Sequence, residues 1–204
     1  MSLKLGRLRV RVTFFFTVFL ALLLLSPGRA AAGALLLSAA VHECAHLFAL
    51  LAFGAPEVTL WLLPGGARMR AGAMDTLPYG AQAAALLAGP AASLLLAGAF
   101  FCVHRAFSPP WALKWAQINA ALGFANLLPL SFLDGGAALV ALLALRRKKE
   151  APPSLGRSDL IVTAVLTALC LALALFGVRA ELFTAFTCYC AASVILRERK
   201  RKER

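Results

Sequence analysis

The chain has 204 residues, of which 61% are hydrophobic and 15% charged, and its mean hydropathy is +0.81. Soluble domains are nearer half apolar and a quarter charged, so this composition excludes an ordinary soluble protein, and its hydrophobicity excludes intrinsic disorder. The net charge of +12 raises the question of a nucleic-acid partner, which the positions of the basic residues answer.

Apolar blocks separated by charged or Pro/Gly-rich segments predict an all-α polytopic membrane protein with about six transmembrane helices. We expect one domain over residues 1–204. Blocks two, three and five are long enough to cross hydrocarbon, whereas the first and sixth need their flanking residues or a thinned bilayer. The predicted spans cover residues 12–26, 30–53, 79–103, 111–145, 160–178 and 182–196.

The first block has two interpretations. Four basic residues from Lys4 to Arg11 precede it, and Ala30-Ala31-Ala32 follows it, which is also the layout of a cleavable signal peptide. We favour a retained first span, because six crossings give the basic residues a consistent distribution.

With the N-terminus in the cytoplasm, 17 of the 21 Lys and Arg residues lie on the cytoplasmic side and three lie outside, with Lys114 just within the fourth span. This distribution follows the positive-inside rule and places both termini in the cytoplasm. The basic residues then meet anionic lipid at the cytoplasmic face and need no nucleic-acid partner. They also lack the interleaved aromatic residues of a nucleic-acid surface.

Few ionisable residues lie deep in the apolar blocks, and three of them form the pattern H-E-x-x-H. His42 and His46 are one helical turn apart, so both imidazoles can bind one tetrahedral zinc ion. Glu43 lies on the flank of that face, where it can act as a general base without being a ligand. His104, at the end of the third block, is interpreted as an interfacial histidine with no role.

Asp134 supplies a third candidate ligand, as a catalytic zinc site requires. It follows an interruption at Asn126 and Pro129 and precedes Gly135 and Gly136, so the fourth span is predicted to be a broken helix. Asn126 has two interpretations of equal weight: a hydrogen-bond donor to the substrate carbonyl or oxyanion, or a residue that satisfies local backbone groups.

Residues 57–71 form a loop between the second and third blocks. Glu57–Leu63 favours a strand, Pro64-Gly65-Gly66 a turn, and residues 67–71 a returning strand, which together predict a short membrane-associated β-hairpin. An exposed strand here could pair with an extended substrate. An ordinary amphipathic loop on the membrane is an equal alternative.

At this point the sequence resembles the site-2 protease family of intramembrane zinc metalloproteases. The resemblance is carried by His42-Glu43-x-x-His46 in one span and by Asn126-x-x-Pro129-x-x-x-x-Asp134-Gly135 two spans later. Leu62–Gly66 in the loop and Gly89-Pro90 in the third span also match. Within the family the chain most resembles the stage IV sporulation protein FB branch of the bacterial cell membrane, and we expect neither the CBS domain that many members of this branch carry nor a PDZ domain.

The resemblance implies one zinc ion held by His42, His46 and Asp134, with Glu43 activating water. It further implies hydrolysis of a peptide bond in a membrane-associated regulatory protein, such as a pro-sigma factor in sporulation, and membrane proteins that inhibit or regulate the enzyme. Two rival hypotheses stay open: a metal-ion transporter, and an inactive scaffold that binds substrate proteins.

Overall fold

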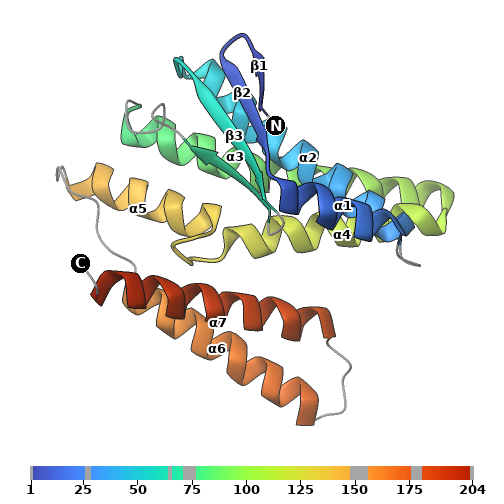
Figure 1. Cartoon of the computed structure of the whole chain (residues 1–204). Coiled ribbons are helices and arrows are strands. Elements are labelled where there is room, and N and C mark those ends of the chain that lie inside the picture. The colour runs from blue at the N-terminus through green and yellow to red at the C-terminus, as the bar shows by residue number, and fades with distance from the viewer. Residues whose placement is uncertain are drawn as a thin grey trace.

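The structure, a computed structural model, describes residues 2–25, 29–63, 66–70, 77–147, 156–175 and 181–202. It is mostly helical, with one small sheet beside the N-terminal helices (Figure 1). The elements in chain order are β1 (Ser2–Leu5), β2 (Leu8–Val12), α1 (Phe14–Leu25), α2 (Arg29–Ala52), β3 (Val58–Leu63), β4 (Gly66–Arg70), α3 (Tyr79–Phe107), α4 (Pro110–Leu127), α5 (Asp134–Arg147), α6 (Gly156–Leu175) and α7 (Glu181–Lys202).

The sheet has the order β1-β2-β3-β4. The strands predicted in residues 57–71 are present as β3 and β4, which pair antiparallel; the predicted turn at Pro64 and Gly65 lies outside the described residues. The other two strands were not predicted. Residues 2–12 form an antiparallel hairpin whose second strand runs parallel to β3, so the mostly helical fold carries a four-stranded sheet in place of the predicted two-stranded hairpin.

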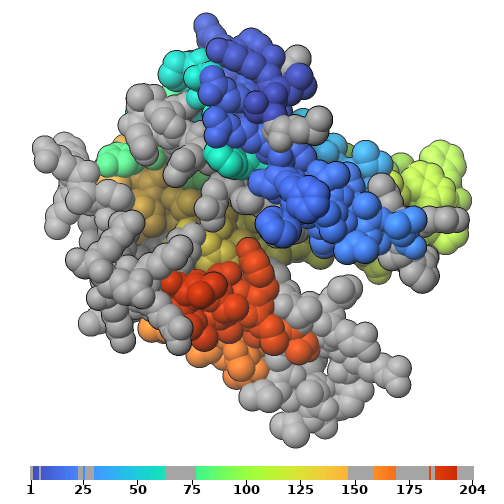
Figure 2. All heavy atoms as spheres, in the orientation of Figure 1, coloured from blue at the N-terminus to red at the C-terminus, as the bar shows by residue number. Residues whose placement is uncertain are grey.

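The N-terminal hairpin also moves the start of the first helix. Val12 is the last residue of β2 and not the first residue of a span. Thr13 then starts α1 at Phe14, because its hydroxyl accepts the N–H of Phe16 at 3.3 Å. The resulting helix has 12 residues, about 18 Å of rise, and is shorter than the hydrocarbon core. In Figure 2 the side chains of the hairpin and α1 (blue) cover the upper part of the molecule.

Among the described residues, two helical segments are long and apolar enough to cross a membrane, Ala30–Ala52 and Tyr79–Phe107. Shorter apolar segments cover Asp159–Ala168 and Thr187–Leu196. Six crossings therefore stay a prediction.

The central helix α3 packs against α2, α4 and α5 and buries its small residues. The buried positions include Ala85, Gly89 and Ser93, whereas Leu95 of the same helix is 75% exposed. Phe48 of α2 is likewise 75% exposed. Small residues inside and large apolar residues outside favour a helix bundle surrounded by lipid, where close backbone contact drives helix association.

The helix break predicted in the fourth block separates α4 from α5. Leu128 has φ −57° and ψ 140°, an extended conformation, because the ring of the following Pro129 disfavours a helical residue before it. The α4–α5 loop (residues 128–133) then leads into Asp134, the first residue of α5. Gly135 and Gly136 allow α5 to start against this loop, since a Cβ at either would collide with the backbone carbonyl of Leu127 or Leu130.

Candidate metal centre

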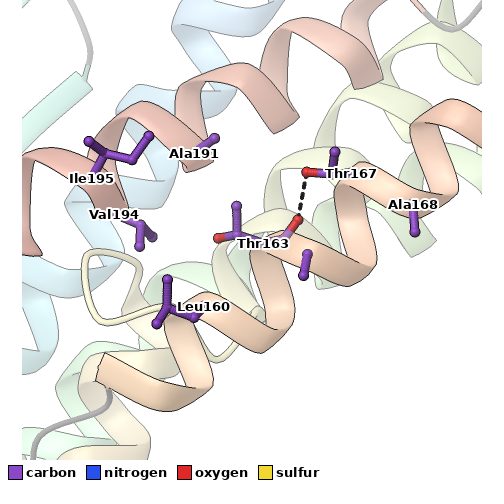
Figure 3. A pocket seen from close by; sticks show the side chains of 8 residues that line it. Leu160, Thr163, Thr167, Ala168, Ala191, Val194 and Ile195 are labelled. Atoms are coloured by element: carbon purple, nitrogen blue, oxygen red, sulfur yellow. Dashed lines mark hydrogen bonds between the residues drawn. The ribbon is translucent and has the colours of Figure 1, made fainter.

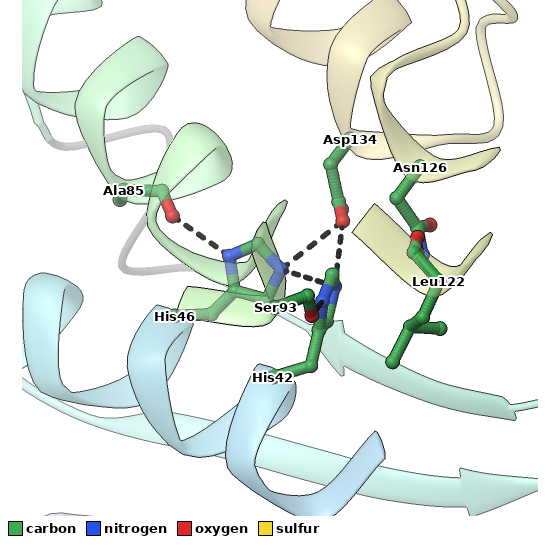
Figure 4. A network of polar contacts seen from close by, with 7 residues as sticks. All are labelled: His42, His46, Ala85, Ser93, Leu122, Asn126 and Asp134. Carbon is green, nitrogen blue, oxygen red and sulfur yellow. Dashed lines mark hydrogen bonds and ion pairs between the residues drawn. The ribbon is translucent and has the colours of Figure 1, made fainter. Parts of the chain in front are cut away.

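Three predicted ligands meet at one point, although they come from helices far apart in the sequence (Figure 4). Asp134 Oδ2 lies 3.0 Å from His42 Nε2 and 3.1 Å from His46 Nε2. The two Nε2 atoms are 3.1 Å apart. His42 and His46 are buried at 4% and 7% exposure, and Asp134 is half-buried. The broken helix thus brings the carboxylate to the histidine pair, as the sequence predicts.

The other ring nitrogens of both histidines bond to α3. His46 Nδ1 donates to the carbonyl oxygen of Ala85 at 2.7 Å, and His42 Nδ1 shares a hydrogen bond of 2.9 Å with Ser93 Oγ. These partners orient the imidazoles in the way that outer partners orient metal-binding histidines. The sequence did not predict either partner.

The bond to Ala85 determines which ring nitrogen of His46 carries a hydrogen and which one faces Asp134. A carbonyl oxygen only accepts, so His46 Nδ1 carries a hydrogen, and Nε2 of the neutral ring carries a lone pair. That lone pair faces a carboxylate oxygen at 3.1 Å. Two acceptors repel each other at this distance unless a cation or a proton lies between them.

The donor set fits zinc. Two neutral imidazole nitrogens and one carboxylate oxygen are among its usual ligands, and three protein ligands leave a fourth position open. Adjacent ligands of a tetrahedral zinc ion lie about 3.3 Å apart, and the spacings here are slightly shorter.

Gly89 of α3 shapes the same point. A Cβ there would lie 2.7 Å from His42 Nε2 and 2.6 Å from His46 Cε1, and would collide with His46 Nε2. The space beside both ligand atoms therefore exists because residue 89 has no side chain. The sequence singles out Gly89-Pro90 only as part of the family resemblance, and the adjoining Pro90 is a proline within the helix.

Glu43 follows His42 on α2 and is half-buried. Its side chain has no hydrogen-bond partner within the described ranges, which suits a base that must receive a proton. Asn126 is near Asp134 in Figure 4, but its Nδ2 donates to the carbonyl oxygen of Leu122 on its own helix at 3.0 Å. This hydrogen bond satisfies a backbone carbonyl of its own helix, which is the second of the two interpretations given to Asn126. Nδ2 has a second hydrogen, so a bond to substrate is compatible with the first.

An apolar pocket lies elsewhere in the described part of the chain. It is an open, apolar groove of about 450 Å³ between α6 and α7, lined by residues such as Ala164 and Ala191 (Figure 3). No titratable side chain lines it. The chemistry therefore belongs to the buried histidine–aspartate cluster rather than to this groove.

His104, the histidine without a predicted role, lies at the end of α3 with its Nδ1 3.1 Å from the carbonyl oxygen of Pro109. It is absent from the cluster of potential ligands found in the described part of the chain.

The fold is similar to that of the site-2 protease from Methanocaldococcus jannaschii. The TM-score is 0.62 and the identity 23%, and the likeness covers 96% of this chain and 94% of that chain. No family model matches the chain, and no curated protein matches it. The likeness extends over nearly the whole chain and shows that the two proteins share a fold.

Proposed function

We propose that this protein is an intramembrane zinc endopeptidase of the site-2 protease type. The observation that carries the proposal is the buried convergence of His42, His46 and Asp134, with His46 Nε2 turned toward a carboxylate oxygen. The fold shared with a site-2 protease supports it independently. His42, His46 and Asp134 would hold one zinc ion per chain.

Zinc bound there supplies Lewis acidity, which activates water and polarises the scissile carbonyl. Glu43 takes the proton from the attacking water and later delivers it to the leaving amine. Asn126 offers its second amide hydrogen to the carbonyl oxygen of the substrate. The Ala85 and Ser93 bonds keep both imidazoles in their orientation during these steps.

The substrate must be extended at the cleaved bond, because a helix hides its peptide groups. Pairing with a strand can supply that conformation. Among the described strands β3 has neighbours on both sides, β2 and β4, so we propose that the edge of β4 pairs with the substrate. The class of substrate we propose is a membrane-associated regulatory protein, with a sporulation pro-sigma factor as the specific case.

Retention of the first helix is part of the proposal. Removing a signal peptide that ends near residue 29 would remove β1, β2 and α1 and leave β3 unpaired on one side. The pairing of β2 with β3 keeps residues 8–12 and 58–62 on one face of the membrane, which is compatible with two crossings between them. We also propose that the C-terminus is cytoplasmic and that the basic residues contact anionic lipid on that side. Membrane proteins that inhibit or regulate the enzyme are a further part of the proposal.

The test is co-expression of a candidate substrate with the wild type and with Glu43→Gln. We expect processing by the wild type and none by the variant, which keeps all three ligands and loses only the base. His104→Ala is the matched control, because this histidine is outside the cluster, and it should process normally. Equal processing by the wild type and Glu43→Gln would rule out the proposed chemistry.

Zinc content gives a second measurement on the same proteins. The wild type, Glu43→Gln and His104→Ala should each contain about one zinc ion per chain, whereas His42→Ala should contain little. Absence of zinc from the purified wild type, after growth with added zinc, would overturn the metalloprotease proposal.

A further inference from the structure

A second buried carboxylate, Asp159, has no part in the chemistry described above. It lies in the first turn of α6 and is 5% exposed. Its charge is favoured by the positive end of the α6 dipole, but the ion pairs found among the described side chains do not include it. A buried carboxylate needs partners for its oxygens, and both of its partners belong to one residue.

That residue is Ser131, in the middle of the α4–α5 loop. The Ser131 N–H donates to Asp159 Oδ1 at 2.7 Å, and the Ser131 hydroxyl donates to Asp159 Oδ2 at 2.6 Å. Short hydrogen bonds to an ionised acceptor are among the stronger ones, and two of them fix the orientation as well as the distance. Asp159 therefore holds the loop at a point three residues before Asp134.

The loop transmits this restraint to Asp134. The N–H of Leu133 donates to the carbonyl oxygen of Leu130 at 2.9 Å, and the N–H of Ala137 donates to that of Leu133 at 3.0 Å. Since Gly136 packs directly on the Leu130 backbone, the loop and the first turn of α5 form one compact unit. A shift of Ser131 would displace Asp134 from the two histidines.

Apolar packing supports the same connection. Leu130 is fully buried and forms a cluster with Leu166 of α6 and Cys190 of α7. The rings of Phe132 and Tyr189 meet edge to face, with centroids 5.9 Å apart. Figure 1 shows the α6–α7 pair beside the α4–α5 connection. The C-terminal helices thus meet the rest of the protein at the loop that leads into the third candidate ligand, Asp134.

We infer that Asp159 is a positioning residue for the metal centre: through Ser131 it holds the α4–α5 loop so that Asp134 stays in ligand position. The inference rests on the proposed function, because it concerns how firmly the candidate site holds zinc. It assigns to α6 and α7 a role in the stability of a metal site to which they contribute no ligand.

The test is the rate at which zinc passes from the full-length protein in detergent to a chromogenic chelator. Loss of an outer partner of a metal site typically weakens the site by about 10–100-fold, so Asp159→Ala should lose zinc faster by that order. Ser131→Ala should raise the rate of zinc loss less than Asp159→Ala does, because the backbone N–H of residue 131 still bonds to Asp159. The double variant, Ser131→Ala with Asp159→Ala, should lose zinc at the same rate as Asp159→Ala alone, because both substitutions break the same connection.

Two further variants separate positioning from general stability. Asp159→Asn keeps an acceptor for the Ser131 N–H and a donor for the Ser131 oxygen, so it should lose zinc within about threefold of the wild-type rate. Thr167→Ala removes a bond within α6 and should behave as the wild type. On an extended peptide substrate, Asp159→Ala should lower kcat with little change in KM, because a displaced ligand impairs the chemical step.

The outcomes distinguish the two proposals. A wild type without zinc overturns the proposed function. A wild type that holds zinc, with Asp159→Ala losing it at the same rate, overturns the positioning role alone. If Asp159→Ala does not fold, Ser131→Ala decides: zinc loss faster than in Thr167→Ala supports the role, and an equal rate contradicts it.

Discussion

Gly89 determines how closely α3 approaches the metal ligands. Because a Cβ at this position would crowd the Nε2 atoms of both His42 and His46, we expect Gly89→Ala to abolish zinc binding. The helix itself should tolerate the change, since alanine is a better helix former than glycine. Zinc per chain, measured after purification, should fall from about one to below about 0.1, the effect expected when a ligand set cannot close on its ion.

Gly98 provides the control in the same helix. A Cβ there meets nothing within 4 Å, so Gly98→Ala makes the same chemical change without crowding the ligands. It should keep a full complement of zinc. Normal zinc in Gly89→Ala would show that the ion does not occupy the space beside residue 89, and the ligand geometry proposed here would be wrong.

At the scale of residues, the sequence predicted the three side chains that the structure brings together and missed the groups that orient them. H-E-x-x-H is readable because helical spacing alone places two histidines together. Ala85, Ser93 and Asp159 act through contacts between segments far apart in the sequence, and no local pattern encodes which segments meet. Ala85 contributes only a backbone carbonyl, so its side chain gives no signal of the role.

At the scale of elements, a buried hydrogen bond joins α2 to α4. Asn119 Nδ2 donates to Ser38 Oγ at 3.0 Å and to the carbonyl oxygen of Trp115 at 2.9 Å. Ser38 lies one helical turn before His42. The bond therefore fixes α4 against the helix that carries both histidines.

We expect Ser38→Ala to destabilise the fold only modestly. Hydrogen bonds between membrane helices contribute about 0.6 kcal/mol on average and at most about 1.7 kcal/mol, and Asn119 keeps its bond to Trp115. The measurement is the free energy of unfolding in mixed micelles with increasing SDS. Thr17→Ala, which removes an exposed bond within α1, should have no measurable effect. A loss above about 3 kcal/mol would place Ser38 in a larger polar network than this one bond.

The elements themselves were predicted unevenly. The α4–α5 break follows from Pro129 and the glycines after Asp134, because local chemistry ends one helix and permits the next. The N-terminal strands were missed although Leu8–Val12 alternates apolar and basic residues. The same basic residues suit the cytoplasmic flank of a retained first span, and the partner strand β3 is some 50 positions away, beyond the reach of local patterns.

At the scale of the whole molecule, the sheet combines two stretches of basic sequence. Lys4 and Arg9 lie 3.6 Å and 3.4 Å from Glu57, and Arg11 stacks on Trp61 at 4.8 Å. These exposed contacts contribute little stability individually. They do, however, gather positive charge at the sheet. Helix α3 has 29 residues and about 43 Å of rise, so it is long enough to cross the bilayer and place its C-terminal end on the opposite side.

The positive-inside distribution then predicts that Glu57 is cytoplasmic and Ala106, near the end of α3, is outside. Both side chains are exposed, so each can be replaced by a single cysteine after the five native cysteines are changed to alanine. A membrane-impermeant maleimide should label Ala106→Cys in intact cells and Glu57→Cys only in inverted vesicles. Labelling of both from the same side would mean that α3 does not cross the membrane. Labelling of Glu57→Cys from outside would reverse the topology and remove a cytoplasmic edge strand as the place where a substrate is extended.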